Sequence, residues 1–308
     1  MPADDVLDRE LAGLDQLELT TTTTRSFASR AWTATWPKLT AIGIVVLFWQ
    51  ILVWREWRPS FVLPGPADVA RQLWEDLGTP ELWRAIGYTM QRAVIGFALA
   101  LVIGGIIGLL VSRSRILRIA IGSLITGLQT MPSIAWFPLA ILLFQLTEQA
   151  ILFVVVLGAA PSIANGIIAG VDSVPPSLRR VGRTLGARGI PLYRDIIVPA
   201  AMPAMLAGLK QGWAFSWRSL MAGELLVIIP GTQSLGTRLQ FAREFSDTTS
   251  LIATMIVILV IGIAVDTLVF GKIERGVLRR RGLLVDDIAV TTSSRSNRRE
   301  LASAAAGH

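Results

Sequence analysis

The segment Arg92–Val111 reads RAVIGFALALVIGGIIGLLV, and Arg92 is its only charged residue. A helix needs about 20 mostly apolar residues to cross the ~30 Å hydrocarbon core of a bilayer, so this segment predicts a transmembrane helix. Small residues recur at every fourth position and therefore share one helix face. They are Gly96, Ala100, Gly104 and Gly108. Such a face lets a second helix approach closely, which predicts a bundle of packed membrane helices.

Five more apolar segments flank this one. They are residues 39–54, 116–146, 150–171, 200–229 and 251–270. Pro132 and Pro138 are expected to interrupt the third span in chain order, and Pro161 lies inside the fourth. Proline is tolerated in a membrane helix where neighbouring groups satisfy the carbonyls it leaves free. The predicted fold class is an all-α integral membrane protein with six transmembrane helices.

The composition agrees with a membrane protein and excludes several kinds of chemistry. The 308 residues are 52% hydrophobic and 17% charged, with a mean hydropathy of +0.57, whereas soluble domains carry about 25% charged residues. There is no Cys, and His308 is the single His, which excludes thiol nucleophiles and histidine or thiolate metal sites. No Walker A sequence occurs. We therefore expect no catalytic residue, metal site or bound cofactor on this chain.

Basic residues concentrate in alternate loops. Lys and Arg outnumber Asp and Glu by 29 to 22, a net charge of +7. The excess lies in residues 112–118, 172–199 and 272–281, whereas residues 55–88, 147–149 and 230–250 have none. Basic loops stay on the cytoplasmic side of a membrane, so both termini are predicted to be cytoplasmic in a bacterial plasma membrane. The isoelectric point of the chain is near 10.8, which in a soluble protein would suggest nucleic-acid binding. On so apolar a chain this alternative explanation of the basic residues is disfavoured.

The two ends of the chain differ from its middle. Residues 1–38 are polar, and the spacing of Leu7, Leu11 and Leu14 predicts a short acidic amphipathic helix. We interpret this segment as a loosely held cytoplasmic tail; the alternative is a helix that docks on a partner. Residues 39–281 form the predicted transmembrane domain. Residues 282–308, rich in Ser, Arg and Ala, are expected to be disordered.

The loop at residues 175–199 carries the functional signal. Its Leu178, Val181 and Leu185 recur at helical spacing on one face, after two prolines and Ser177, an expected helix cap. Gly186 or Gly189 is expected to end this helix, and Pro191 to begin another short one. The loop thus predicts two surface helices whose apolar residues need a partner to cover them.

Here the sequence resembles the integral membrane permease family of binding-protein-dependent ABC importers. That family carries a cytoplasmic loop of pattern E-A-A-x-x-x-G-x(9)-I-x-L-P. Gly186, Ile196, Val198 and Pro199 reproduce its second half at the same spacing, whereas Arg180-Val181-Gly182 replaces Glu-Ala-Ala. Further segments resemble the family across roughly residues 39–281. They are 61–66, 92–97, 131–139 and 214–226, the last similar to the fifth helix of the sulfonate, taurine and nitrate group.

The resemblance implies a type I importer fold and a set of partners. Two permease copies, identical or related, would line a path for a small solute delivered by an external solute-binding protein. Two cytoplasmic ATPase subunits would bind ATP and Mg and dock on the 175–199 loop. The residues implied in this coupling are Leu178, Val181, Leu185, Gly186, Ala187 and Pro199. The cargo stays open among sulfonate, taurine, nitrate, bicarbonate and heterocyclic precursors.

The fifth span contains Lys210, Arg218 and Glu224, and ionisable residues at membrane depth suggest function. Five residues of this helix lie along one side of it, namely Lys210, Trp213, Trp217, Met221 and Glu224. We expect this stripe to line the translocation path or to pack inside the bundle. Lys210 is expected to reach the cytoplasmic interface. Arg218 is a candidate contact for an anion, the alternative being a structural bond to Glu224 or a backbone carbonyl. Gln129 would line the path or form an interhelical hydrogen bond.

Other functional classes fit the sequence less well. A secondary transporter working alone, with Glu224 and Arg218 as a proton-coupled site, lacks the second half or inverted repeat common in such folds. A non-transporting anchor leaves the polar loop helices and the intramembrane charges unexplained. A membrane enzyme lacks a recognisable catalytic constellation.

Overall fold

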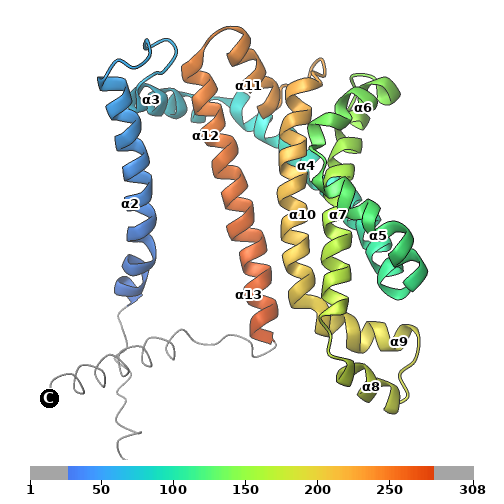
Figure 1. Cartoon of the computed structure of the whole chain (residues 1–308). Coiled ribbons are helices and arrows are strands. Elements are labelled where there is room, and N and C mark those ends of the chain that lie inside the picture. Colours follow the sequence, from blue (N-terminus) through green and yellow to red (C-terminus); the bar gives the residue numbers. More distant parts are fainter. Residues whose placement is uncertain (1–26, 281–308) are drawn as a thin grey trace, which may run out of the picture. The chain divides into compact units, whose positions relative to one another are not determined.

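A computed structural model describes residues 27–280 of the chain (Figure 1), and all of the regular secondary structure in this range is helical. It divides between Pro66 and Ala67 into two compact units. The predicted acidic helix at Leu7–Leu14 and the predicted disordered tail, 282–308, lie outside the described residues. The expected domain boundaries therefore stay predictions.

The first unit contains one long helix, α2 (Phe27–Trp54). It begins well before Leu39, where the sequence predicted the first span, and contains Pro37. Its apolar part, Thr35–Trp54, has 20 residues, enough for about 30 Å at 1.5 Å per residue. This unit therefore supplies one membrane-spanning helix.

The second unit supplies the remaining spans. Its helices are α3 (Pro66–Leu77), α4 (Pro80–Arg113), α5 (Arg115–Thr130), a 3-10 turn (Ser133–Trp136), α6 (Phe137–Phe144), α7 (Glu148–Asp172), α8 (Pro176–Thr184), α9 (Ile190–Leu192), a π-helical turn (Tyr193–Ile197), α10 (Val198–Leu226), α11 (Leu235–Glu244), α12 (Thr248–Val265), a second π-helical turn (Asp266–Phe270) and α13 (Gly271–Arg280). Over residues 27–280, five helical runs are long and apolar enough to span a membrane, or six if a bent pair counts as one. The predicted all-α membrane fold is confirmed.

The bent pair is the predicted third span. α5 and the run Ser133–Phe144 meet at 103°, so this segment is a broken span or a re-entrant loop. Met131 and Pro132 at the break are extended, because a proline disfavours helical geometry in the residue before it. Pro138 interrupts nothing, contrary to expectation, since it sits in the first turn of α6, where no backbone N–H is needed.

Helix α7 forms the core of the second unit and packs against both α4 and α10. The small residues predicted on α4 are all buried against it. A Cβ on Gly104 would lie 2.5 Å from the carbonyl oxygen of Ala160, and Gly166 of α7 meets Gly208 of α10 backbone to backbone. Helices that touch through their backbones cannot accept added atoms, which fixes the relative positions of these three spans.

Different helices lie at the two ends of the second unit (Figure 1). Helices α8 and α9 lie at one end, and α11 and the start of α4 lie at the other. α4 begins at Pro80, well before the predicted Arg92, so residues predicted as a polar loop belong to this helix.

The N-terminus of α12 is capped by Asp247. The backbone N–H of Ser250 donates to the Asp247 carboxylate at 3.0 Å, and this hydrogen bond lowers the pKa of Asp247.

Gly104→Ala should destabilise the second unit by about 1–3 kcal/mol, because the new methyl group meets a backbone oxygen that cannot rotate away. Gly105→Ala is the matched control, since nothing lies within 4 Å of a Cβ there and alanine favours a helix. Thermal denaturation of the detergent-solubilised protein measures both. Equal melting temperatures for the two variants would contradict the close α4–α7 contact.

Candidate functional site

The first helix predicted in the 175–199 loop is present as α8, and its ends are set by local sequence. Pro176 occupies its first turn and Pro175 its N-cap position, so Ser177 lies inside the helix and does not cap it as predicted. At the other end the N–H of Ala187 donates to the carbonyl of Gly182 at 3.0 Å, while Gly186 has a φ of +88°. This Schellman arrangement makes Gly186 the residue that ends the helix.

Helix α8 is attached to the bundle at Gly182, but the apolar residues around this contact are not covered within the described chain. Gly182 faces Leu192 and Ile196 so closely that a Cβ would clash with both. The expected docking residues stay exposed: Leu178 is 39%, Val181 54% and Leu185 79% exposed. A helix that leaves three apolar side chains uncovered next to a tightly packed face has the form of a docking surface.

The loop is also fastened to the ends of the spans. Arg179 donates to the carbonyl of Val171 at the end of α7, and the guanidinium of Arg113 at the end of α4 lies 5.9 Å from the ring centre of Tyr193. Of the remaining predicted residues, Ala187 packs against the core and Pro199 lies half-buried in the first turn of α10. These contacts let a displacement of α8 reach α4, α7 and α10 together.

The second loop helix is not separate from the fifth span. From Ile190 to Leu226 the chain is one helical run of 37 residues that includes the π-helical turn Tyr193–Ile197. The sequence predicted a short helix after Pro191 and a distinct span from residue 200. Because π-helical turns often occur at functional sites, the junction between coupling loop and α10 is a natural place for movement.

At the opposite end, Glu224 of α10 is buried in an ion cluster. Its side chain has no exposed surface and lies 3.0 Å from Nη1 of Arg92, which is 6% exposed. The Oγ1 of Thr89 donates to Glu224 at 2.9 Å, and the N–H of Gly236 donates to it at 3.1 Å. A buried carboxylate is tolerated only with such a full set of donors.

Arg92 is shared between two carboxylates. Its Nε and Nη2 donate to the two oxygens of Glu148 at 2.7 and 2.6 Å, the bidentate geometry of strong arginine–carboxylate pairs. Nη2 also donates to Oγ1 of Thr232 at 3.1 Å. Since Glu148 is 42% exposed, this side of the cluster is in contact with solvent while the Glu224 side is not. The cluster joins α4, α7, α10 and the segment leading into α11.

Sequence reasoning found Glu224 but not its partners. Arg92 was interpreted as the polar start of a span, and Glu148 as a loop residue. Arg92 and Glu224 are 132 positions apart, so helical periodicity, which relates neighbours only, cannot pair them. The available signal was that Arg92 is the only charge in an otherwise apolar span, which implies a buried partner.

The predicted stripe on α10 packs inside the bundle. Trp213 meets Phe97 edge-to-face at 5.4 Å and stacks on Trp217 at 6.2 Å. Met221 packs against the same core. The Nζ of Lys210 lies 3.2 Å from Asp266 on the π-helical turn Asp266–Phe270, and the expected reach of Lys210 to the cytoplasmic interface stays a prediction. Of the two outcomes expected for this stripe, the structure shows the packed one.

Arg218 lies away from that stripe. It is exposed; its Nε donates to the carbonyl of Ala214 at 3.3 Å and its guanidinium lies 4.5 Å from the ring centre of Phe215. Of the structural alternative, the pair with Glu224 is not formed, since Glu224 is bonded to Arg92, whereas the expected bond to a backbone carbonyl is present. Gln129 accepts a hydrogen bond from Asn165 at 2.7 Å, the predicted interhelical bond.

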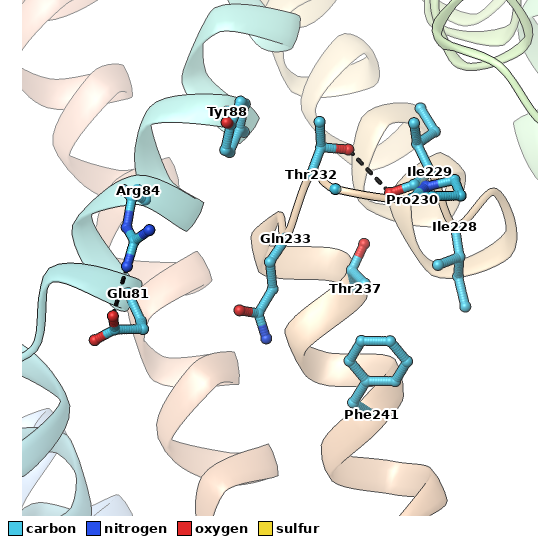
Figure 2. Close-up of a pocket in the computed structure, with 11 residues that line it drawn as sticks. Glu81, Arg84, Tyr88, Ile228, Ile229, Pro230, Thr232, Gln233, Thr237 and Phe241 are labelled. Atoms are coloured by element: carbon cyan, nitrogen blue, oxygen red, sulfur yellow. Dashed lines mark hydrogen bonds and ion pairs between the residues drawn. The ribbon is translucent and has the colours of Figure 1, made fainter.

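A pocket of about 370 Å³ opens next to the ion cluster (Figure 2). Its walls are the first turns of α4, the segment between α10 and α11, and α11 itself. The lining residues are Glu81, Arg84, Tyr88, Ile228, Ile229, Pro230, Gly231, Thr232, Gln233, Thr237 and Phe241. Thr232 therefore belongs to both the pocket and the ion cluster.

Residues 84–277 match the model of the family described as binding-protein-dependent transport system inner membrane component. The chain belongs to this family. The match covers the coupling loop, the ion cluster and Arg218, and it confirms the resemblance drawn from the loop. The chain is a multi-pass permease subunit of an ABC importer, and a stand-alone secondary transporter is not favoured.

Individual relatives agree with the family. A nitrate import permease protein of Synechocystis sp. is 28% identical over 235 residues, which are 73% of this chain and 83% of that protein. A protein of Escherichia coli, provisionally named an aliphatic sulfonates transport permease, is 30% identical over 75% of this chain and 86% of its own length. An inward-facing structure of the MetNI methionine ABC transporter superposes with a TM-score of 0.54 at 19% identity, covering 64% of this chain and 95% of that one. This last likeness shows the fold alone.

Arg92→Leu should destabilise the subunit by about 3–5 kcal/mol, because it leaves Glu224 buried without its counter-ion. Arg84→Leu on the same helix breaks an exposed pair with Glu81 and should change stability by at most about 1 kcal/mol. Denaturation in detergent compares the two. If Arg92→Leu were as stable as Arg84→Leu, the ion cluster would not hold this end of the bundle together.

Proposed function

We propose that two copies of this chain, together with two ATP-binding subunits and an external solute-binding protein, import a small anion. ATP and Mg would be held by the ATP-binding subunits. The observation that supports the ATPase assignment is that Leu178 and Val181 of α8 and the C-cap residue Leu185 stay uncovered, although the neighbouring Gly182 packs tightly against the bundle. A groove on an ATPase subunit would cover these side chains and give α8 the partner that the chain itself lacks.

The orientation follows from charge. Around α8 lie Arg179, Arg180, Arg183 and Arg188, and Arg113 and Arg118 lie at the α4–α5 junction. The positive-inside rule assigns these loops to the cytoplasm, where ATPase subunits are found. Both termini are then cytoplasmic, and the pocket beside the ion cluster is external. The chain would lie in the plasma membrane with its coupling loop inside the cell.

The anion assignment rests on two supports. Relatives of similar length are named for nitrate and for aliphatic sulfonates, both planar or tetrahedral oxyanions. Arg218 is exposed on α10 without an acidic partner in the ion pairs of the described chain, and Gln211 lies exposed two turns before it. A guanidinium offers such anions several fixed donors. The face of α10 with Arg218 would thus line the path between the two copies.

The mechanism follows from the continuity of the loop with α10. Closure of the ATPase pair on ATP would shift α8, and the helical run Ile190–Leu226 would carry that shift through the membrane. Since α4 and α7 are fastened to the same loop and to each other, they would move with α10 as one body. ATP must bind the outward-open state more tightly than the inward-open one, or it could not drive this change.

Leu185→Asp should abolish co-purification of the ATPase subunit, because a charge replaces an apolar side chain at the centre of the proposed contact. Leu185→Met is the matched control: it keeps the apolar volume and should retain the complex. The ratio of ATPase to permease after affinity purification measures both. A complete complex with Leu185→Asp would overturn the assignment of α8 as the docking helix.

Arg218→Ala should lower anion uptake at least tenfold in proteoliposomes that contain the whole complex, because the cargo loses its charged contact. Arg218→Lys should retain part of the uptake, since it keeps the charge but not the planar donors. ATPase assembly should be unchanged in both variants. Normal uptake by Arg218→Ala would remove this residue from the path.

A further inference from the structure

Helix α3 carries apolar side chains on two sides of its axis. Val69 and Leu73 face inward: Val69 is buried, and Leu73 packs against the apolar cluster shared by α4, α11 and α12. A second apolar stripe occupies an arc of about 80° at 3.6 residues per turn. It consists of Ala67, Ala70, Trp74 and Leu77, all of them exposed, with Trp74 exposed by 79%. The described chain therefore leaves one apolar side of α3 uncovered.

The remaining surface of α3 is charged. Asp68, Arg71 and Glu75 are exposed there, one Arg against two acids, which gives a net charge of −1. So small a charge gives little electrostatic preference for a charged partner. With 12 residues the helix is about 18 Å long, too short to cross a bilayer. An exposed apolar side next to an exposed charged side is the pattern of a helix that lies in the membrane interface.

The orientation of α3 is fixed by the rest of the unit. The buried carboxylate of Asp76 forms an ion pair with Arg238 of α11, and it accepts a hydrogen bond from Nε2 of Gln72 at 3.2 Å. At the end of the helix, Nε1 of Trp83 donates to the carbonyl of Leu77 at 3.0 Å, which ties α3 to the first turn of α4. The apolar stripe cannot turn inward without separating a buried ion pair, and such a separation is costly.

The surface next to α3 is that of a membrane span. Only Gly78 and Thr79 separate α3 from α4, which is long and apolar enough to cross a bilayer. Trp83 in the first turn of that span is exposed, like Trp74. Tryptophan concentrates where a bilayer meets water, because its ring is apolar and its N–H is polar. Figure 1 shows α3 at the end of the unit opposite α8, lying across the direction of α12.

We propose that α3 is docked on the membrane surface, with lipid of the interfacial layer opposite α8 covering its apolar stripe and water meeting its charged side. Lipid is the occupant that the surroundings favour, because the stripe adjoins the start of a span and carries no charge. Since Asp76 and Arg238 join α3 to α11, the contact also holds α11 at one depth. The inference goes beyond the proposed function and depends only on the membrane fold, whatever the cargo or the ATPase.

The first experiment distinguishes the two exposed sides of α3 with single thiols, which the absence of cysteine from the sequence permits. Nitroxide labels on Ala70→Cys and Leu77→Cys probe the stripe, and labels on Asp68→Cys and Glu75→Cys are the matched controls. In phosphatidylcholine vesicles that contain the full chain, oxygen, which partitions into lipid, should relax the stripe labels several-fold more than a water-soluble nickel chelate does. The controls should show the opposite preference.

Two results of this experiment would overturn the proposal. Relaxation mainly by nickel at all four positions would place α3 in water. Weak relaxation of the stripe labels by both reagents would show that protein covers the stripe, either a second copy of the chain or another subunit. Neither result concerns transport, so a failure of the proposed function, such as absent uptake by the whole complex, would be recognised separately.

The second experiment asks whether the apolar stripe or a charge carries the contact. The Ala70→Cys label is measured again in vesicles in which half of the phosphatidylcholine is replaced by phosphatidylglycerol. Its preference for oxygen should change less than twofold, because the exposed charges of α3 nearly cancel. A label that contacts lipid only in the anionic vesicles would show that Arg71 binds headgroup phosphate, and this would overturn the assignment to the stripe.

A third experiment tests the ion pair that orients α3. Asp76→Asn removes the charge opposite Arg238, and the oxygen preference of the Ala70→Cys label should then fall at least twofold. The exchanged pair, Asp76→Arg with Arg238→Asp, should restore the preference, and Glu75→Gln on the exposed side should leave it unchanged. An undiminished preference in Asp76→Asn, or no recovery in the exchanged pair, would remove this ion pair from the docking of α3.

Discussion

The guanidinium of Arg92 is the group on which the end of this subunit opposite α8 depends. It is almost completely buried, and its donors reach two carboxylates and a hydroxyl on three other parts of the chain. A buried charge is tolerated only while its partners stay in place, so each of these parts must keep its position relative to α4. Helix ends that could otherwise separate in the membrane are held to one arrangement by this requirement.

A second constraint operates in the middle of the bundle, where backbones touch. Gly104 and Gly108 of α4 lie against the backbone of α7, and Gly166 of α7 lies against Gly208 of α10. In lipid, helix association depends on such close packing because there is no water to expel. These contacts leave no room for added atoms between α4, α7 and α10 along the stretch between the 175–199 loop and the ion cluster.

Helix α10 connects these two sites directly. It has 29 residues, about 43 Å at 1.5 Å per residue. Pro199 near its start belongs to the coupling loop, and Glu224 near its end belongs to the ion cluster. From Ile190 to Leu226 the run is helical throughout, and the π-helical turn Tyr193–Ile197 is the one change of helix type within it. Transport by rigid rotation of the bundle is consistent with this construction.

The sequence predicted what depends on local pattern. Apolar runs located the spans, the four-residue repeat on α4 identified its packed face, and the spacing around Gly186 located α8 and its exposed side. It did not predict the 103° bend in the third span, because Pro132 marks an interruption of the helix without fixing the direction of the chain after it. Nor did it pair Arg92 with Glu224, since that contact depends on how three helices are arranged in space.

Arg92 and Arg218 show how the same residue type acquires different roles in one membrane protein. Both lie on helices long enough to span a bilayer, and either would be unstable in contact with hydrocarbon. Arg92 is satisfied by carboxylates inside its own subunit, which makes it structural. Arg218 has a backbone carbonyl and an aromatic ring as its neighbours and remains exposed. The face of α10 that carries Arg218 is therefore better suited to water, another subunit or an anion than to lipid, and this supports the role proposed for it in the translocation path.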